Sequence, residues 1–250
     1  MAEYPGFGVL VARLSGHRDL DVDALARLAG VEESELQAVY DGAAPSPAQV
    51  RALAPALGFH VADMFVIADM GVPDELAPLD AGARTRVSQL VGLAVRLSPD
   101  RRRRLFQLVA ALPQEDRTQP VPPPRAHEQY QPGLGALFLR MLGNRNLGWL
   151  GAAKTLAHLT NGHVYLAASM IGMVGHGRKE LTPDLVTGFA IVLGIPADDL
   201  AAMTGIELGG VTMPHNPAAA DVAELIWNVR RLKADQVRQL CDEAESMRQE

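Results

Sequence analysis

The chain has 250 residues, of which 48% are hydrophobic and 21% charged, and this composition excludes a long disordered, collagen-like or fibrous structure. The length exceeds what one helical core accommodates comfortably, so we expect two domains of roughly 100–150 residues each. The formal net charge of −6 argues against a protein that coats nucleic acid through bulk electrostatics, so any contact with DNA must be local.

The sequence predicts a cytoplasmic protein that does not enter a membrane. The longest apolar stretches, such as Gly162–Val174, fall short of the roughly 20 residues that a membrane-spanning helix needs. The N-terminus lacks the basic region and apolar run of a secretory signal. The single cysteine, Cys241, excludes an internal disulfide bond and a cysteine-based zinc site, which fits a reducing compartment.

The first 66 residues carry apolar side chains at helical spacing and therefore predict five short helices. The successive groups are Val9, Leu10 and Leu14; Val22, Leu25 and Leu28; Leu36 and Val39; Val50, Leu53 and Leu57; and Val61, Met64 and Phe65. Asp21 or Asp23 can cap the second helix, and Pro47 suits the first turn of the fourth. Because no segment shows sustained strand alternation, we expect an all-α fold.

Two further segments follow these helices. Residues 83–112 predict a helical extension, because their apolar side chains again recur at helical spacing. The segment Gln119–Pro132 carries five prolines among polar residues. Proline-rich chains favour the extended polyproline conformation, so we interpret this segment as a linker between two domains.

The second half of the chain repeats the first. Residues 8–20 and 135–147 are identical at six of thirteen positions at an offset of 127, and residues 57–64 match residues 193–200 at an offset of 136. We therefore predict one copy of a duplicated unit on each side of the linker. The first unit is residues 1–118, with a core at 7–66 and the extension 83–112; the linker is 119–132; the second unit is residues 133–250, with a core at 134–206 and an extension at 220–248.

The core of the first unit carries a distinctive pattern of small and apolar residues. It comprises Leu25–Val31, Leu36, Val39, Asp41, Gly42, Pro45, Leu53–Phe59 and Val61–Phe65. The pattern resembles the XRE or lambda-repressor-like helix-turn-helix family. Together with the repeat and the helical extensions, this resemblance implies two tandem helix-turn-helix domains, each followed by a C-terminal helical pair. Ala26 suits the close contact between the two helices of the motif, and Gly30 suits the positive φ of the turn.

The second unit is a looser copy of this pattern. Leu156 and Ala157 can stand for the second helix, Asn161 and Gly162 for its turn, and His163–Gly175 for the third helix. The interval between the glycines that flank the third helix is 15 residues here, against 12 in the first unit. We therefore expect the region of the third helix to be longer in the second unit.

The resemblance implies that the third helix of a unit enters the major groove of double-stranded DNA. In the first unit the corresponding positions are Glu32, Glu33, Glu35 and Gln37. Residues 1–80 contain four basic and thirteen acidic residues, and like charges within about 8–10 Å oppose the approach of DNA. We expect this unit to keep the scaffold without reading DNA. The alternative is that its glutamates accept hydrogen bonds from cytosine amino groups.

The second unit suits DNA better, since residues 134–206 carry five basic and four acidic residues. Its candidate DNA-binding residues are Asn161, His163, Tyr165 and Ser169 for base edges and Arg178 and Lys179 for phosphates. The alternative is that the apolar residues among them place the helix in a core or a partner surface. Those apolar residues are Val164, Leu166, Met170, Ile171, Met173 and Val174.

A run of four arginines lies on a predicted helix of the first extension. It consists of Arg101, Arg102, Arg103 and Arg104. A charge run of this kind is usually a solvated helix face. The alternatives are that it holds DNA phosphate or pairs with the acidic surface of Glu32–Glu35.

No constellation of residues in the sequence indicates catalysis, so we expect neither enzyme activity nor a cofactor. His158, His163 and His176 are spaced by 5 and 13 residues, which does not put them on one helical face. We therefore expect no metal site.

Two hypotheses about function remain. The first is a transcriptional regulator that binds double-stranded DNA through the second unit, an expectation that comes from the family resemblance. The second is an interaction or effector-binding protein on the same scaffold, without DNA binding. A positive face over the third helix of the second unit would favour the first, and an exposed apolar patch the second. Whether the chain also forms a homodimer or binds another protein stays open.

Overall fold

The computed structural model describes residues 4–118, 120–210 and 213–249, and within these ranges the chain has fourteen α-helices, two short 3-10 turns and no strand. The expected all-α fold is confirmed. Gln119, the first residue of the predicted linker, lies outside the described residues, as do residues 1–3, 211–212 and 250 of the predicted units. Within the described ranges no single helix is long and apolar enough to cross a membrane.

Five short helices form the first half, as the apolar spacing predicts. They are α1 (Phe7–His17), α2 (Val22–Ala29), α3 (Glu33–Tyr40), α4 (Pro47–Ala56) and α5 (Val61–Ile67). The carboxylate of Asp21 accepts a 2.7 Å hydrogen bond from the backbone N–H of Ala24 and so caps α2. Ser46 and Gln49 form a reciprocal capping box at the start of α4, and Pro47 occupies its first turn.

The second half repeats this order of helices. They are α8 (Leu134–Asn144), α9 (Trp149–Leu159), α10 (Ala168–Gly175), α11 (Pro183–Leu193) and α12 (Ala197–Thr204). In each half the first helix touches the third through a glycine. A Cβ at Gly8 of α1 would lie 2.0 Å from the carbonyl oxygen of Val39 in α3. A Cβ at Gly135 of α8 would lie 2.0 Å from the carbonyl oxygen of Val174 in α10, so only glycine permits either contact.

The third helix of the second half is shorter than predicted. α10 begins at Ala168 rather than at His163, and it has eight residues, as α3 does. Gly162 adopts a φ of 81°, and the hydroxyl of Thr160 accepts a 3.0 Å hydrogen bond from the backbone N–H of Val164. This backbone turn and this hydrogen bond are compatible with a loop between α9 and α10 rather than with a continuous helix from His163. The extra residues therefore lengthen the loop between α9 and α10 and leave the helix unchanged in length.

Each half continues into a helical pair. The first pair follows the turn η1 (Ala81–Ala83) and consists of α6 (Arg84–Ala94) and α7 (Pro99–Ala111), and the second consists of α13 (Ala219–Val229) and α14 (Ala234–Gln249). Both α13 and α14 pack against α6 and α7. The four extension helices therefore bury their apolar faces against one another within one chain.

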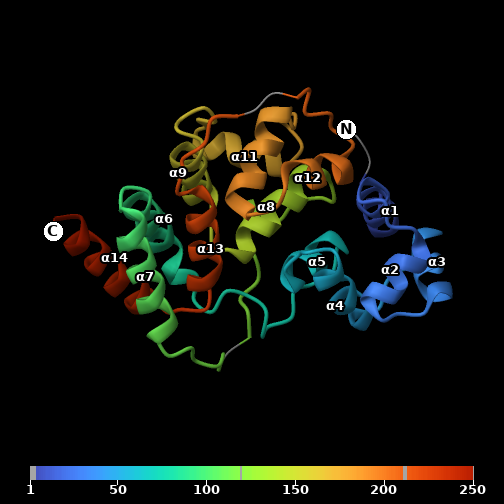
Figure 1. Cartoon of the computed structure of the whole chain (residues 1–250), viewed down its shortest axis with the longest axis horizontal. Helices are drawn as coiled ribbons and strands as arrows, with labels where there is room; N and C mark the ends of the chain where they lie inside the picture. Colours follow the sequence, from blue (N-terminus) through green and yellow to red (C-terminus); the bar gives the residue numbers. More distant parts are fainter. Residues whose placement is uncertain (1–3, 119, 211–212, 250) are drawn as a thin grey trace.

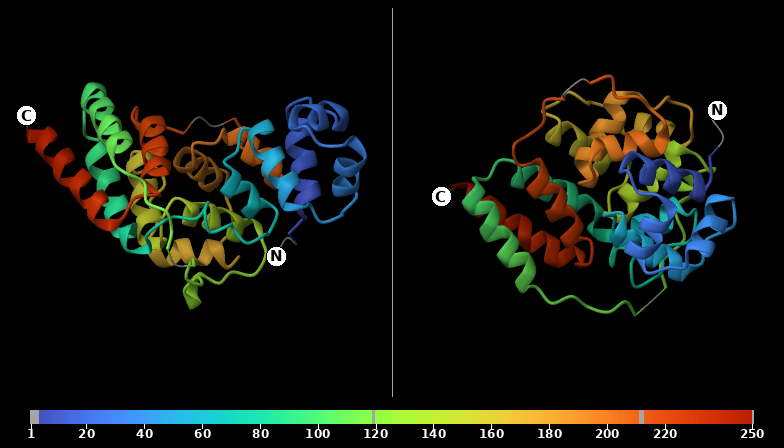
Figure 2. Two further views of the ribbon diagram at one scale, coloured as in Figure 1. Left: turned by 90° about the horizontal axis from the view of Figure 1, so that it is seen from below. Right: turned by 45° about the vertical axis from the view of Figure 1, so that its right-hand side comes forward.

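The two halves exchange helix contacts. α1 packs on α12 and α5 packs on α8, so the first helix of each half lies against the fifth helix of the other. In addition, α6 of the first half packs on α9 of the second, whereas α13 packs on α11 within the second half. Figure 1 shows an elongated arrangement with α2 and α3 at one end and α7 and α14 at the other, and the two views in Figure 2 agree. Among the residues that the structure describes, one cluster of buried apolar residues runs through both halves.

Within residues 120–132 the proline-rich segment has no regular secondary structure except for the 3-10 turn η2 (Ala126–Glu128). The carboxylate of Glu128 accepts two hydrogen bonds from Arg84 of α6, of 2.8 and 2.9 Å. The hydroxyl of Tyr130 accepts a 2.6 Å hydrogen bond from the indole N–H of Trp149 in α9. The segment is thus attached to the first extension at one point and to the second half at another.

Candidate nucleic-acid interface

The helix expected to read DNA, α10, packs its inner face against α8 and α9. Ile171 and Val174 of this helix are buried, as is Val164 in the loop before it. Gly172 lets the ring of Trp149 come close, since a Cβ there would lie 2.5 Å from the ring. The alternative that apolar residues place this helix in the core is thus correct for Val164, Ile171 and Val174. Their burial positions α10 and the loop before it.

The candidate DNA-binding residues of the second unit lie on the outer side of the same segment. Asn161, His163, Tyr165, Ser169 and Arg178 are exposed, and Lys179 is half-buried. The backbone N–H groups of Arg178 and Lys179 donate to the carbonyl oxygen of Met173, at 2.8 and 3.2 Å, which holds the turn against the end of α10. The imidazole of His163 lies 3.8 Å from the carboxylate of Asp184 at the start of α11.

Apolar side chains share this outer side. Tyr165 is 81% exposed and Met173 is 43% exposed, whereas Leu166 and Met170 are half-buried. Ser169 and Met173 are four residues apart on α10 and therefore lie next to each other on its exposed face. The loop before α10, the exposed side of α10 and the turn after it together offer polar groups for base edges and apolar groups for a partner.

The third helix of the first half is exposed and acidic. Glu32, Glu33, Glu35 and Gln37 all lie on the surface. Gln37 donates to Asp41 at 2.9 Å, and Gln49 donates to Glu35 at 3.1 Å. Both donors are neutral amides, so they leave the negative charges in place. A phosphate backbone that approached α3 would meet these carboxylates.

The arginine run of α7 does not form one solvated face. Arg102 is 8% exposed and donates through Nε to Asp221 of α13 at 2.8 Å, whereas Arg103 pairs with Asp100 on its own helix at 2.9 Å. The prediction of a solvated face is therefore wrong for Arg102, because helix packing turns this position toward α13. Pairing of the run with Glu32–Glu35 is also excluded, since α7 and α3 lie at opposite ends of the molecule (Figure 1).

No family model, curated protein or solved structure matches this chain. The function of α10 and its flanking segments therefore depends on what their exposed groups can bind. Amide, imidazole, hydroxyl and guanidinium groups can form hydrogen bonds with base edges and phosphates. In the described part of the chain no group of three or more histidine, cysteine or carboxylate side chains could hold a metal ion.

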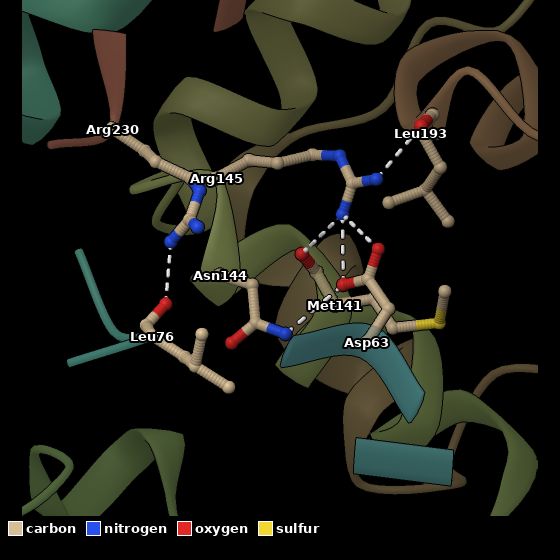
Figure 3. A network of polar contacts seen from close by, with 7 residues as sticks. All are labelled: Asp63, Leu76, Met141, Asn144, Arg145, Leu193 and Arg230. Carbon is tan, nitrogen blue, oxygen red and sulfur yellow. Dashed lines mark hydrogen bonds and ion pairs between the residues drawn. The ribbon is translucent and has the colours of Figure 1, made fainter. Parts of the chain in front are cut away.

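An ion pair that the sequence pattern did not reveal joins the two halves (Figure 3). Arg145, directly after α8, lies 2.9 Å from the carboxylate of Asp63 in α5, and neither side chain has any exposed surface. The same guanidinium donates to the carbonyl oxygen of Leu193 at 2.8 Å. The contact holds the end of α8 against α5, and α8 in turn links the second half to the first.

The first half carries the matching pair. Arg18, directly after α1, donates through Nε to Asp199 of α12 at 3.0 Å and through Nη1 to the carbonyl oxygen of Leu57 at 3.0 Å. Arg18 and Arg145 are separated by the offset of 127, and Asp63 and Asp199 by the offset of 136. The repeat therefore contained the signal for both pairs, because an arginine and a carboxylate recur at equivalent positions of the two halves. Each arginine pairs with the carboxylate of the other half.

An aromatic contact lies beside the buried pair. The ring of His60 stacks on Trp227 of α13 with a centroid distance of 3.5 Å. The guanidinium of Arg230 lies 3.8 Å from the same indole ring and donates to the carbonyl oxygen of Leu76 (Figure 3). Burial lowers the pKa of His60 to about 4 and the pKa of Arg230 to about 10. These contacts attach α13 to the first half.

Proposed function

We propose that this protein is a transcriptional regulator that binds double-stranded DNA. In this proposal it contains two tandem helix-turn-helix units of the XRE or lambda-repressor-like type, and α10 of the second unit reads the DNA. The observation that carries the proposal is the division of residues 161–179, which comprise α10 and its flanking segments: the buried residues are apolar, five of the six polar and basic candidates are exposed, and Lys179 is half-buried. A helix with one face in the core and polar groups on or beside its outer face suits a groove-reading segment.

Two further observations support the proposal. The turn after α2 contains Gly30 with a φ of 68°, as a tight turn between two helices requires. Gly162, in the longer loop after α9, also has a positive φ, of 81°. The charges favour the second unit as the reader, because α3 presents exposed glutamates whereas α10 is followed by Arg178 and Lys179. The first unit then serves as a structural or partner-binding half.

Gel retardation of the full chain with DNA from its own promoter region tests this proposal. Arg178→Glu combined with Lys179→Glu reverses two charges beside α10. We expect the double variant to abolish retardation at about 0.1–0.15 M salt, because phosphate contacts supply much of the affinity for DNA. The matched control is Arg101→Glu combined with Arg103→Glu, which makes the same change of charge on α7.

Each result has a definite meaning. Unchanged retardation by the α10 variant would refute α10 as the reader. Loss of retardation by the α7 variant would assign the phosphate contact to the arginine run instead. If the unmodified chain shifts no DNA and captures none from sequenced genomic fragments, the proposal of DNA binding fails.

The second candidate function is an interaction or effector-binding protein on the same scaffold, without DNA binding. The exposure of Tyr165 and Met173 favours it, because exposed apolar groups often mark partner surfaces. If the partner is a second copy of the chain, Tyr165→Ser combined with Met173→Ser should weaken self-association in analytical ultracentrifugation. Specific retardation of promoter DNA by the unmodified chain would exclude this candidate.

A further inference from the structure

A cavity of about 890 Å³ lies where the proline-rich segment crosses the junction of the two halves. Its walls are the loop after α5, the proline-rich segment, α8 and the start of α9. In Figure 1 both connecting segments run beneath α8, on the side away from α11. The volume falls in the range of about 300–1,000 Å³ that is typical of small-molecule sites.

The cavity combines apolar walls with an excess of positive charge. Val66, Met70, Val72, Leu139, Leu147 and Trp149 supply much of the apolar lining. Among the described residues, four arginines and two carboxylates also line it, an excess of two positive charges. Of these, Arg84 pairs with Glu128 and Arg140 with Asp69. The first pair joins α6 to the proline-rich segment, and the second joins α8 to the loop after α5.

The remaining two arginines of the lining, Arg117 and Arg125, account for this excess. The guanidinium of Arg117 donates to the backbone carbonyl oxygens of Asp74, at 3.3 Å, and Pro78. Carbonyl oxygens carry no formal charge, so these contacts orient the guanidinium without neutralising it. A guanidinium held in this way is suited to a carboxylate, sulfonate or phosphate group.

We propose that this cavity binds a small amphipathic anion, a molecule with an apolar body and one acidic group. The apolar body would displace water from the side chains of the lining, which supplies most of the affinity. The acidic group would bind at the arginine side of the cavity, with Arg117 as its main partner. The chemical class follows from the lining alone and does not depend on DNA binding.

The cavity shares two wall residues with the inner face of α10. The ring of Trp149 lies against Gly172, and the ring of Tyr130 lies against Gly175, where a Cβ would be 2.6 Å from it. The N–H of Trp149 donates to the hydroxyl of Tyr130, so the two rings form one unit. A ligand that moved this unit would also move α10. The proposal therefore extends to regulation of DNA binding by the ligand, and this step rests on the proposed function.

The chain offers a matched pair of variants that tests the cavity. Gly143 of α8 lines the cavity, and a Cβ there meets no atom within 4 Å, so Gly143→Phe places a ring in the open space. Gly16 is its equivalent in α1 at the offset of 127, also has no atom within 4 Å of a Cβ, and is exposed away from the cavity. Gly16→Phe is the control for adding a ring at this position of the helix.

The probe is 8-anilinonaphthalene-1-sulfonate, an apolar anion whose fluorescence rises on binding. We expect the unmodified chain and Gly16→Phe to bind it with the same Kd, and Gly143→Phe to bind it about tenfold more weakly or not at all. Arg117→Gln should weaken its binding by about fivefold and leave that of the neutral N-phenyl-1-naphthylamine unchanged. Equal binding by the two phenylalanine variants would overturn the cavity as the site. Tighter binding of the neutral probe would overturn the anionic class.

A second measurement needs no variant that has to fold. The chain has two tryptophans, and only Trp149 lines the cavity. In nitrogen-15 NMR spectra of the unmodified chain, the sulfonate probe should shift the indole N–H signal of Trp149 and leave that of Trp227 in place. A shift of Trp227 alone, or of neither, would contradict binding in the cavity.

The regulatory step has its own readout. In gel retardation, a saturating concentration of the sulfonate probe should change the Kd for promoter DNA by about threefold or more in the unmodified chain and in Gly16→Phe, and not in Gly143→Phe. Binding of the probe with an unchanged Kd for DNA would overturn the coupling to α10 and keep the ligand site. Absence of DNA binding without the probe would overturn the proposed function instead, so the two failures are distinguishable.

Discussion

Arg145, directly after α8, and Asp63 in α5 form a fully buried ion pair between segments that are far apart in the sequence, with Nη1 of Arg145 lying 2.9 Å from Oδ2 of Asp63. The equivalent pair, Arg18 with Asp199, joins the end of α1 to α12, and its arginine is 28% exposed. Because each pair takes its arginine from one half and its carboxylate from the other, the chain contains a pseudo-symmetric interface of the kind that a homodimer forms between two subunits.

The different burial of these two pairs predicts different costs of breaking them. Asp63→Asn leaves the guanidinium of Arg145 buried without a counter-charge, and we expect it to lower the free energy of unfolding by about 3–5 kcal/mol. Asp199→Asn should cost clearly less, because Arg18 can reach water. Urea unfolding followed by circular dichroism measures both values. Equal losses would mean that burial does not set the strength of these pairs.

Four glycines of α1 and α8 predict opposite effects of alanine. Gly8→Ala and Gly135→Ala each place a methyl group 2.0 Å from a backbone carbonyl oxygen. We expect each to lower the free energy of unfolding by about 1–3 kcal/mol, as overpacking does. Gly16→Ala and Gly143→Ala meet no atom within 4 Å and should raise it by about 0.5 kcal/mol through helix propensity. Thermal unfolding of the four variants checks the contrast, and a stabilising Gly8→Ala would contradict the close packing of α1 on α3.

The contact between His60 and Trp227 predicts a pH dependence of stability. Burial lowers the pKa of His60 from 6.5 to about 4, an effect that Arg145 and Arg230 reinforce and Asp63 opposes. Above pH 6.5 the imidazole is neutral in both states. As the pH falls from 6.5 toward about 4, the unfolded chain takes up the proton first, so the folded state loses stability.

The variant His60→Phe isolates this effect. Phenylalanine can stack on Trp227 but does not titrate, so we expect the urea midpoint of the variant to fall less between pH 7 and pH 5 than that of the unmodified chain. The comparison at pH 7 is the internal control for lost packing. An identical fall in both proteins would place the titrating group elsewhere.

The acidic surface of α3 predicts a gain in affinity when its charge is removed. Changing Glu32, Glu33 and Glu35 together to glutamine removes three exposed negative charges from the first half. If the chain binds DNA as proposed, its nonspecific affinity should rise and its salt dependence should steepen. Titrations of fluorescent DNA at several salt concentrations measure both. A fall in affinity would instead mean that these carboxylates contact DNA productively.

Local structure followed closely from the sequence. Apolar spacing predicted the five helices of the first half, Asp21 and Pro47 marked two of the helix starts, and the offsets of the repeat predicted the same order of helices in the second half. The start of α10 was predicted five residues too early. The error arose because apolar residues such as Val164 are equally compatible with a buried loop and with a helix.

The sequence by itself determined the all-α class, the order of the helices and the exposed polar residues around α10, because helix periodicity, capping and turn formation depend on neighbours a few residues away. Only the tertiary structure decided that the first helix of each half packs on the fifth helix of the other. It also decided that Arg145 and Arg102 are buried while Arg103 is exposed, and that the proline-rich segment lines a cavity. Each of these depends on partners far away along the chain, which spacing within a single helix does not encode.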